Sequence, residues 1–324
     1  MEMNSQQKIL ELKQIIGEKL TPLITGNYIL LDLPYYTNVG DTLIWQGALD
    51  FLKTLPYKCL YSSSAENYRT TEIDNNVIIL LTGGGNFGDL WRRHQIFRRK
   101  IIAAFPNNTI ILLPQSVFYK DFSLLKEDAE IFSQHKNLTM CFRDINSLDT
   151  ACKYFQNSRN ILLPDMAFCI DMSKWKKYIR QTEPQKILYL DRKDCEKNDS
   201  QHYDIIPPEA ENHDWTAMEK MPHGFVLFKK LQFLLQKIDK ISGLQLNDTV
   251  SDAVYQKIMR KYFICSGISF LSAYSTVYTT RLHGAILSVL LDKPVNIFDN
   301  SYGKNSSFYN TWLSDVENIK IIHK

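Results

Sequence analysis

The sequence repeats one step, from a short and continuously apolar segment to a longer segment whose apolar residues recur at helical spacing. NYILLDL (27–33), for example, precedes DTLIWQGALDFLKTL (41–55). Strands that are apolar on both faces belong in sheets covered on both sides, as parallel sheets joined by helices are. Further strand-like segments lie at 76–82, 108–116, 138–144, 160–170, 186–194, 275–281 and 293–299. The sequence therefore predicts an α/β fold with parallel sheets.

The length of the chain suits two domains. It has 324 residues, and a single hydrophobic core rarely serves more than about 250–300. The polar segment WKKYIRQTEPQ (175–185) contains a proline and precedes a new strand, so we place a boundary within it. We expect a first domain over 1–180, a second over 181–300, and a segment over 301–324 that returns toward the first domain.

The second half has a less regular pattern than the first. Residues 195–224 show neither strand nor helix spacing, and we expect a long loop or an insertion there. Helical spacing returns at 225–239 and at 251–274. This half still ends with strand, helix and strand, which supports a second α/β domain.

Composition excludes several classes of function. The formal net charge of +3 gives no overall electrostatic reason for nucleic-acid binding. The six cysteines are dispersed, without the spacing of a zinc site, and we expect reduced thiols and no metal. The N-terminal segment lacks the apolar core of a signal peptide, and no apolar run reaches the roughly 20 residues that span a bilayer. We expect a soluble, cytoplasmic protein, whose oligomeric state the sequence does not reveal.

The first candidate binding loop is YYTNVGDT (35–42). In parallel sheets, ligands bind at the carboxyl ends of the strands, where the chain enters the next helix. Asn38 and Asp41 offer polar side chains there, and Gly40 lets the backbone approach a ligand. Asp41 or Thr42 would alternatively cap the following helix.

The second candidate loop is LLTGGGNFGDLW (80–91), with Gly84, Gly85 and Asn86. Three glycines between a strand and a helix expose amide N–H groups beside the positive end of a helix, as an anion cradle does. The segment has neither the GxGxxG pattern nor a Walker lysine. A tight turn is the alternative, but a single turn rarely needs three glycines.

Two more strand ends supply polar residues. LLPQSV provides Gln115 and Ser116, and CFRD provides Arg143. An arginine at a strand end makes bidentate contacts to a carboxylate or phosphate, or else pairs with a neighbour such as Asp144. The two interpretations of Arg143 remain equally open. WRRHQIFRRK (91–100) is basic at helical spacing and is expected to form a solvated helix face.

The segment TTRLHGAILSVLLD places a cation and an imidazole between a strand and a helix. Arg281 ends the strand, and Leu282 and His283 begin the helix. Guanidinium, imidazole and helix N-terminus would all attract an anion at this position. A lone histidine is more often structural, but this one lies where a parallel sheet places its chemistry.

Together these motifs resemble the polysaccharide pyruvyl transferase family. The resemblance rests on NVGDTLIWQGAL, LLTGGGNFGD, LLPQS, FRD, LLPD, TTRLHGAILSVLLDKPVNIFDN and YGKNSSFY. It implies two Rossmann-like domains that face each other across a cleft, as in GT-B glycosyltransferases. It also implies transfer of a pyruvyl group from phosphoenolpyruvate to two hydroxyls of a sugar, with release of phosphate.

The resemblance assigns roles to particular residues. Arg281, Leu282 and His283 fall on the donor-binding and catalytic segment of the family, and Arg143 falls near a second donor-binding arginine. The second domain would then hold the donor, and the first the acceptor. We expect His283 to act as general acid and Asp41 as general base, with Lys304 contacting a substrate. No cofactor or metal is required, because the reaction leaves the P–O bond intact.

Two other functions remain open. A GT-B glycosyltransferase would use the glycines for the diphosphate of a nucleotide sugar and the arginines for its leaving group. A non-catalytic anion-binding or scaffold protein would bind ligand without turnover. If the acceptor is a lipid-linked glycan, the protein would meet it at the inner face of the membrane by peripheral contact. The N-terminal helix or the basic cluster at 92–100 is the surface expected for that contact.

Overall fold

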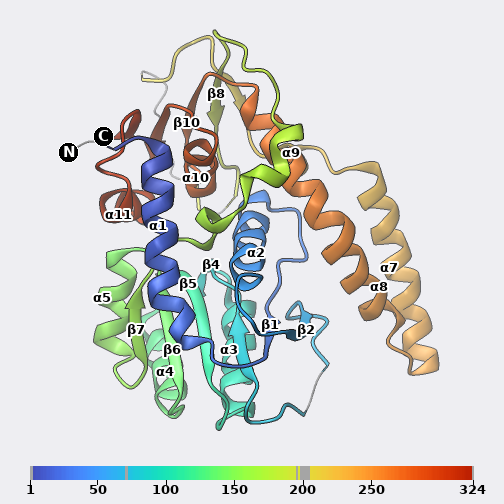
Figure 1. The fold of residues 1–324 in the computed structure, drawn as a ribbon. Helices are drawn as coiled ribbons and strands as arrows, with labels where there is room; N and C mark the ends of the chain where they lie inside the picture. The colour runs from blue at the N-terminus through green and yellow to red at the C-terminus, as the bar shows by residue number, and fades with distance from the viewer. Residues whose placement is uncertain (1–2, 70–71, 195, 198–204, 323–324) are drawn as a thin grey trace.

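A computed structural model of the chain describes residues 3–69, 72–194, 196–197 and 205–322, and its strands form two sheets (Figure 1). Cys195 and part of the predicted 195–224 loop fall outside the described residues. Every strand pair among the described residues is parallel. The predicted α/β class with two Rossmann-like units is therefore confirmed.

The first sheet has the strand order β2-β1-β3-β5-β6-β7, with β4 paired to β5. Its strands are β1 (Tyr28–Leu31), β2 (Cys59–Ser63), β3 (Ile78–Leu81), β4 (Gly84–Gly88), β5 (Ile110–Phe118), β6 (Leu138–Phe142) and β7 (Arg159–Leu162). One face is covered by apolar residues of α3 (Arg92–Ala104), α4 (Phe122–Ser133) and α5 (Ile145–Tyr154). The other face is covered by α1 (Ser5–Leu20) and α2 (Val39–Leu52).

The second sheet repeats this winding in the order β12-β11-β10-β8-β9. Its strands are β8 (Ile187–Leu190), β9 (Glu211–His213), β10 (Thr276–Thr279), β11 (Val295–Phe298) and β12 (Ile319–Ile322). The associated helices are α6 (Thr216–Glu219), α7 (His223–Ser242), α8 (Leu246–Val254), α9 (Arg260–Ser272), α10 (Leu282–Leu290) and α11 (Lys304–Trp312). In both sheets the order reverses next to the first strand, between β1 and β3 and between β8 and β10. Ligands bind parallel sheets at such reversals.

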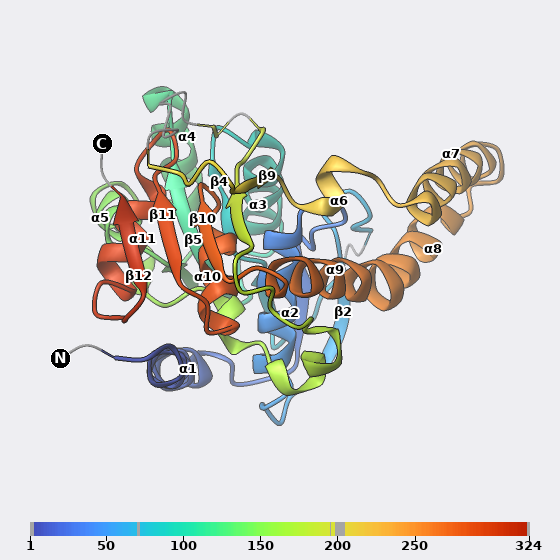
Figure 2. The same cartoon turned by 90° about the horizontal axis from the view of Figure 1, so that it is seen from above.

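The two units share apolar packing. Ile9 and Leu12 of α1 belong to the core of the second sheet, whereas Ile16 and Leu20 of the same helix belong to the core of the first. Val39 and Leu43 of α2 also pack into the second core. Figures 1 and 2 show α1 running along both units and α2 lying between them. Buried apolar side chains on both helices hold the units against each other.

Several sequence predictions need correction. The segment Gly84–Gly88 is a strand and not a loop, because it pairs with the extended end of β5. Residues 195–224 contain strand β9 and helix α6. The helix expected at 251–274 consists of α8, a π-helical turn at Tyr255–Met259 and α9. β12 was not predicted at all.

The division near residue 180 remains a prediction. The structure places it between β7 and β8, the last strand of one sheet and the first of the other. Residues 301–322 contact both units: α11 packs on α5, and β12 pairs with β11. Within the described part of the chain, no helix is both long and apolar enough to cross a membrane.

Candidate functional site

A cavity of about 290 Å³ lies where the two sheets present their reversal points to each other. From the first unit it is lined by Tyr36, Thr37, Asn38, Gly40, Asp41, Gly85, Asn86, Trp91, Arg93, His94 and Arg143. From the second it is lined by Arg192, Asp194, Glu196, Trp215, Met218, Arg281, Leu282, His283 and Lys304. Ten of the thirteen residues predicted for the site therefore border one space.

His283 and Arg143 come from different sheets and meet at one carboxylate. Asp165 Oδ2 accepts a hydrogen bond from Arg143 Nη1 at 2.7 Å and lies 3.3 Å from His283 Nε2. Its other oxygen accepts the Ala167 N–H at 2.8 Å. Burial alone would raise the pKa of Asp165, but His283, Arg143 and this N–H outweigh burial and lower it. Asp165 is therefore an ionised bridge that fixes the imidazole and the guanidinium relative to each other.

The start of α2 lies against the other side of the imidazole. Asn38 is the N-cap, because its Oδ1 accepts the Gly40 N–H at 2.9 Å, so the predicted capping by Asp41 or Thr42 is wrong. The Asn38 Nδ2 donates to Asp41 Oδ2 at 2.8 Å. A Cβ on Gly40 would lie only 2.7 Å from His283 Nδ1. Glycine is needed here because any side chain would push the histidine away.

Two helices begin at the cavity. α2 starts at Val39 in the first unit, and α10 starts at Leu282 in the second, where Arg281 provides no side-chain cap. The positive ends of both helices thus lie at the same cavity, together with five cationic side chains: Arg93, Arg143, Arg192, Arg281 and Lys304. This arrangement favours an anionic ligand.

Arg281 is already held by carboxylates on one side. Its Nε and Nη2 form a two-point contact with Asp214, the Nη2 bond being 2.7 Å, and Nη2 also lies 3.2 Å from Asp194. Asp214 is itself anchored by the Trp215 N–H at 2.7 Å. The arginine, which is only 4% exposed, is thereby fixed in place at the cavity wall.

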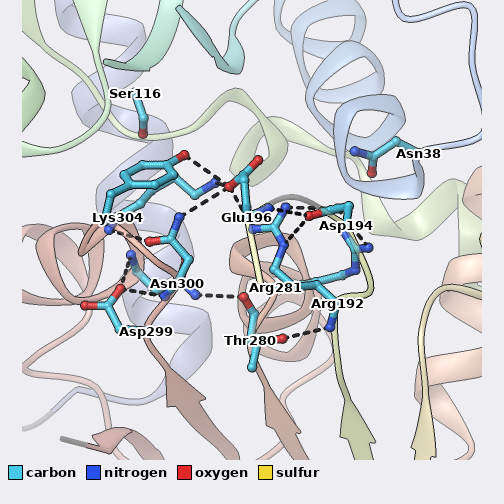
Figure 3. Close-up of polar contacts among 12 residues, drawn as sticks. Asn38, Ser116, Arg192, Asp194, Glu196, Thr280, Arg281, Asp299, Asn300 and Lys304 are labelled. Atoms are coloured by element: carbon cyan, nitrogen blue, oxygen red, sulfur yellow. Dashed lines mark hydrogen bonds and ion pairs between the residues drawn. The ribbon is translucent and has the colours of Figure 1, made fainter. Parts of the chain in front are cut away.

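A second cluster surrounds Glu196, as Figure 3 shows. Its Oε2 accepts from Lys304 Nζ, from Arg192 Nη1 at 2.8 Å and from Tyr302 at 3.1 Å. Arg192 also donates to Asp194 through Nε at 2.9 Å. Glu196 and Asp194 thus form ion pairs with cations that border the cavity.

Burial and charge act in opposite directions on this cluster. Burial raises the pKa of Glu196, but Lys304 and Arg192 outweigh burial and lower it. For Lys304, burial outweighs the attraction of Glu196, with Arg192 and Arg143 adding repulsion, and the pKa falls to about 8. A Cβ on Gly85 would lie 3.2 Å from Arg143 Nη2 and 3.3 Å from Lys304 Nζ. The absence of a side chain at Gly85 therefore leaves room for both cations.

Three predicted residues do not border the cavity. Gln115 is fully buried and donates to the Thr82 carbonyl at 2.9 Å, and Ser116 connects Arg143 Nε with Asp144. Gly84 lies in β4 beneath Asp41. Because β5 continues to Phe118, Gln115 and Ser116 lie inside a strand and not after one. The pairing of Arg143 with its neighbour Asp144, one of the two interpretations of the sequence, is not found. Arg143 pairs with Asp165 instead, and Asp144 caps α5 by accepting the Ser147 N–H.

The basic segment at 91–100 is only in part the solvated face that was expected, because Arg93 and Lys100 are exposed but other basic residues are not. Arg98 is fully buried, where it contacts Asp32 at 3.2 Å and the Asn86 carbonyl at 3.0 Å. Arg92 and Arg99 form ion pairs with Asp128 of α4. The expected anion cradle is likewise wrong, because Gly84–Gly88 is strand and α3 begins only at Arg92.

Most of the carboxylates of the site were not predicted from the sequence. Asp165 follows the end of β7, in a motif noted only for the resemblance, and Arg192, Asp194 and Glu196 follow β8. Both positions are carboxyl ends of strands, the signal used elsewhere. Among the described residues, no group of His, Cys, Asp and Glu side chains is arranged to hold a metal ion.

Comparisons with known proteins agree on one family. The polysaccharide pyruvyl transferase family model matches residues 38–302. The protein EpsO of Bacillus subtilis (strain 168), provisionally named a pyruvyl transferase, is 34% identical over 326 residues, covering 99% of this chain and 96% of its own. Pyruvyl transferase 1 of Schizosaccharomyces pombe is 28% identical over 305 residues, covering 88% of this chain and 69% of its own.

A solved structure shares the fold. The crystal structure of a functionally uncharacterised protein from Klebsiella pneumoniae superposes with a TM-score of 0.60 at 21% identity, over 97% of this chain and 99% of that one. This likeness supports the two-sheet architecture and says nothing of the reaction.

Proposed function

The chain belongs to the polysaccharide pyruvyl transferase family, and we propose that it transfers the pyruvyl group of phosphoenolpyruvate to two hydroxyls of a sugar. The acceptor would be a bacterial-type surface polysaccharide or its lipid-linked precursor. The observation that carries the proposal is the bridge from Arg143 through Asp165 to His283, which joins a cation of one unit to an acid of the other at a single cavity.

The cationic wall suits the donor. Phosphoenolpyruvate carries a phosphate and a carboxylate, and guanidinium and ammonium groups bind both. Arg143 Nη2 and Lys304 Nζ lie side by side next to Gly85, and Arg281 is fixed at the opposite unit. In the proposal these three side chains, with Leu282 at the start of α10, hold the two anionic ends of the donor.

The chemistry follows from this placement. His283 protonates the methylene carbon, which turns the central carbon into an oxocarbenium-like centre, and Asp41 takes the proton of the attacking sugar hydroxyl. The C–O bond to phosphate then breaks, and the second hydroxyl closes the cyclic ketal. The two sugar hydroxyls lose one proton each. One of these protons restores His283, which gave its own proton to the new methyl group, and the other leaves with phosphate. Asp165, whose Oδ2 lies 3.3 Å from His283 Nε2, would hold the ring in place for this step.

The first test is release of inorganic phosphate from phosphoenolpyruvate by the purified protein with galactose- and glucose-terminated acceptors. Acceptor-dependent release, with a product mass that fits a pyruvate ketal, is the expected result. Release of a nucleotide from a nucleotide sugar instead would favour the glycosyltransferase alternative. That alternative relied on a glycine cradle for the diphosphate, but these glycines form β4. Ligand binding without turnover of either donor would favour a scaffold protein.

To bind the cations of the cavity, the anionic groups of the donor must replace carboxylates that already contact these cations. Glu196 holds Lys304 and Arg192, and Asp194 holds Arg192 and Arg281. Asp165 and Asp214 are anchored by backbone N–H groups. We therefore propose that the phosphate takes the place of Glu196.

We expect Glu196→Gln to bind phosphoenolpyruvate more tightly than the wild type, because a neutral amide competes less well for Lys304 and Arg192. A roughly tenfold lower Kd corresponds to about 1.4 kcal/mol of removed competition. Calorimetric titration measures the Kd, and Glu127→Gln, at an exposed ion pair on α4, is the matched control. Unchanged or weaker binding by Glu196→Gln would show that Glu196 does not occupy the phosphate position.

A further inference from the structure

The two surfaces expected to meet a membrane are engaged elsewhere. α1 inserts Ile9, Leu12, Ile16 and Leu20 into the cores of both units. Of the basic residues of α3, Arg98 is buried, Arg92 and Arg99 are ion-paired with α4, and Arg93 is ion-paired with Glu66, whereas Lys100 is exposed. Among the described residues, α1 exposes one large apolar side chain, Leu10, and α3 exposes one, Ile96, so neither helix carries a continuous exposed apolar stripe.

One face of α7 carries apolar side chains that nothing in the described structure covers. The relative exposures are 70% for Leu227, 43% for Leu231, 54% for Leu234, 38% for Ile238 and 90% for Ile241. The spacing of four, three, four and three residues aligns these five side chains, here called the α7 stripe, along one side of the helix for about 20 Å.

The α7 stripe points away from the rest of the protein. α7 packs on its neighbours through a different side, where Phe225 and Phe228 are buried and Gln232 donates to Ser251 of α8 at 2.8 Å. Figures 1 and 2 show that α7 and α8 form a hairpin that stands out from the two sheets. The stripe is therefore accessible to a large partner surface.

Lys230 and Lys237 flank the α7 stripe on one side, and Lys240 lies further round the helix. Lys230, Lys237 and Lys240 are exposed and form no ion pair with any carboxylate in the described part of the chain. The acid on the same helix, Asp239, faces the hairpin turn, where it accepts the N–H groups of Leu246 and Asn247 at 2.9 and 2.8 Å. The exposed side of α7 is thus both apolar and basic.

We propose that α7 docks on the surface of an anionic lipid bilayer. The α7 stripe would lie at the boundary between headgroups and acyl chains, and the flanking lysines would contact anionic headgroups. Basic amphipathic helices with Leu, Ile and Phe on one side bind bilayers in this manner. The heptad-like spacing would also allow pairing with a second copy. However, antiparallel pairing along the stripe would bring Lys230 and Lys237 of the two copies together, so the charges favour lipid.

The test is co-sedimentation of the full chain with phosphatidylcholine vesicles, with and without phosphatidylglycerol, in the absence of any substrate. We expect binding to the anionic vesicles that weakens with added salt, because counterions screen the lysines. Leu227→Gln/Ile241→Gln should reduce the partition coefficient by more than about tenfold. Lys230→Gln/Lys237→Gln should reduce it roughly fivefold for each lysine.

Matched controls separate the α7 stripe from general effects. Leu10→Gln/Leu60→Gln removes two exposed apolar side chains elsewhere, and Lys53→Gln/Lys136→Gln removes two exposed lysines elsewhere. Both should bind like the wild type. Absence of binding to anionic vesicles, or equal loss in stripe and control variants, would overturn the proposal. A dimer in light scattering that Leu227→Gln/Ile241→Gln abolishes, without vesicle binding, would assign the stripe to a second copy. Because no substrate is present, these outcomes are independent of pyruvyl transfer.

Discussion

His283→Ala is expected to reduce acceptor-dependent phosphate release by about 10²- to 10⁴-fold in kcat, the usual contribution of a general acid. His283 begins α10 at the cavity, its Nε2 lies 3.3 Å from the ionised Asp165, and its ring lies against Gly40. No other histidine contacts Asp165 or Arg143 in the described structure. The initial rate of phosphate release at saturating donor and acceptor measures the effect.

Loss of the proton donor has to be distinguished from loss of the fold. His283→Asn fills part of the space beside Gly40 and should be as inactive as the alanine variant, with a similar unfolding temperature to the wild type. His213→Ala, at the half-exposed end of β9, should retain wild-type turnover. Asp41→Asn should slow attack by the sugar hydroxyl without weakening donor binding. Near wild-type turnover in His283→Ala would remove the general-acid assignment, whatever the other variants do.

The alternating pattern of the sequence was enough to predict most of the fold and many residues of the site, from both units. Continuous apolar strands such as Ile78–Leu81 cannot be mistaken for amphipathic helices. In parallel sheets, ligands bind at the carboxyl ends of the strands. This rule alone predicts that His283, Arg281 and Arg143 lie at one site. It worked because these residues directly follow strands with a clear apolar pattern.

The rule failed where a strand lacks that pattern. Asp214, which fixes Arg281, follows β9, whose three residues are Glu-Asn-His and show no apolar period. Gly84–Gly88 forms a strand although glycine disfavours strands, because the far end of β5 offers it a partner. Such pairing depends on sheet geometry, which the local sequence does not contain.

The carboxylates of the site were missed for a different reason. A cation after a strand suggests an anionic ligand, but the sequence does not show how many of these cations are already paired. Arg143, Arg192, Arg281 and Lys304 are matched in the structure by Asp165, Asp194, Asp214 and Glu196. In the proposal, part of this pairing is structural and the contacts of Glu196 are exchanged for substrate. Asp165 and Asp214 are distinguished by the backbone N–H groups that anchor them, and the sequence does not show these contacts.

Asp165→Ala is expected to lower the free energy of unfolding by about 3–5 kcal/mol, because it leaves a buried guanidinium without its counter-ion. The side chains of Asp165 and Arg143 are 0% and 1% exposed, and their oxygen and nitrogen are 2.7 Å apart. Ser116 would be the remaining partner of Arg143, through Nε at 2.9 Å. Urea unfolding at neutral pH measures the loss, and Asp149→Ala, at an exposed position on α5, is the matched control.

The pH dependence of stability tests the charge of Asp165 separately from its volume. Its pKa in the folded protein lies below its ordinary value, because His283, Arg143 and the Ala167 N–H outweigh burial. The unfolded chain therefore takes up a proton first, at about pH 4, and the stabilisation is complete above that pH and is lost as the pH falls further. Asp165→Asn should start less stable at pH 7 and lose less stability than the wild type between about pH 5 and 3. Parallel stability curves for the two proteins in this range would mean that Asp165 is not held as an anion between Arg143 and His283.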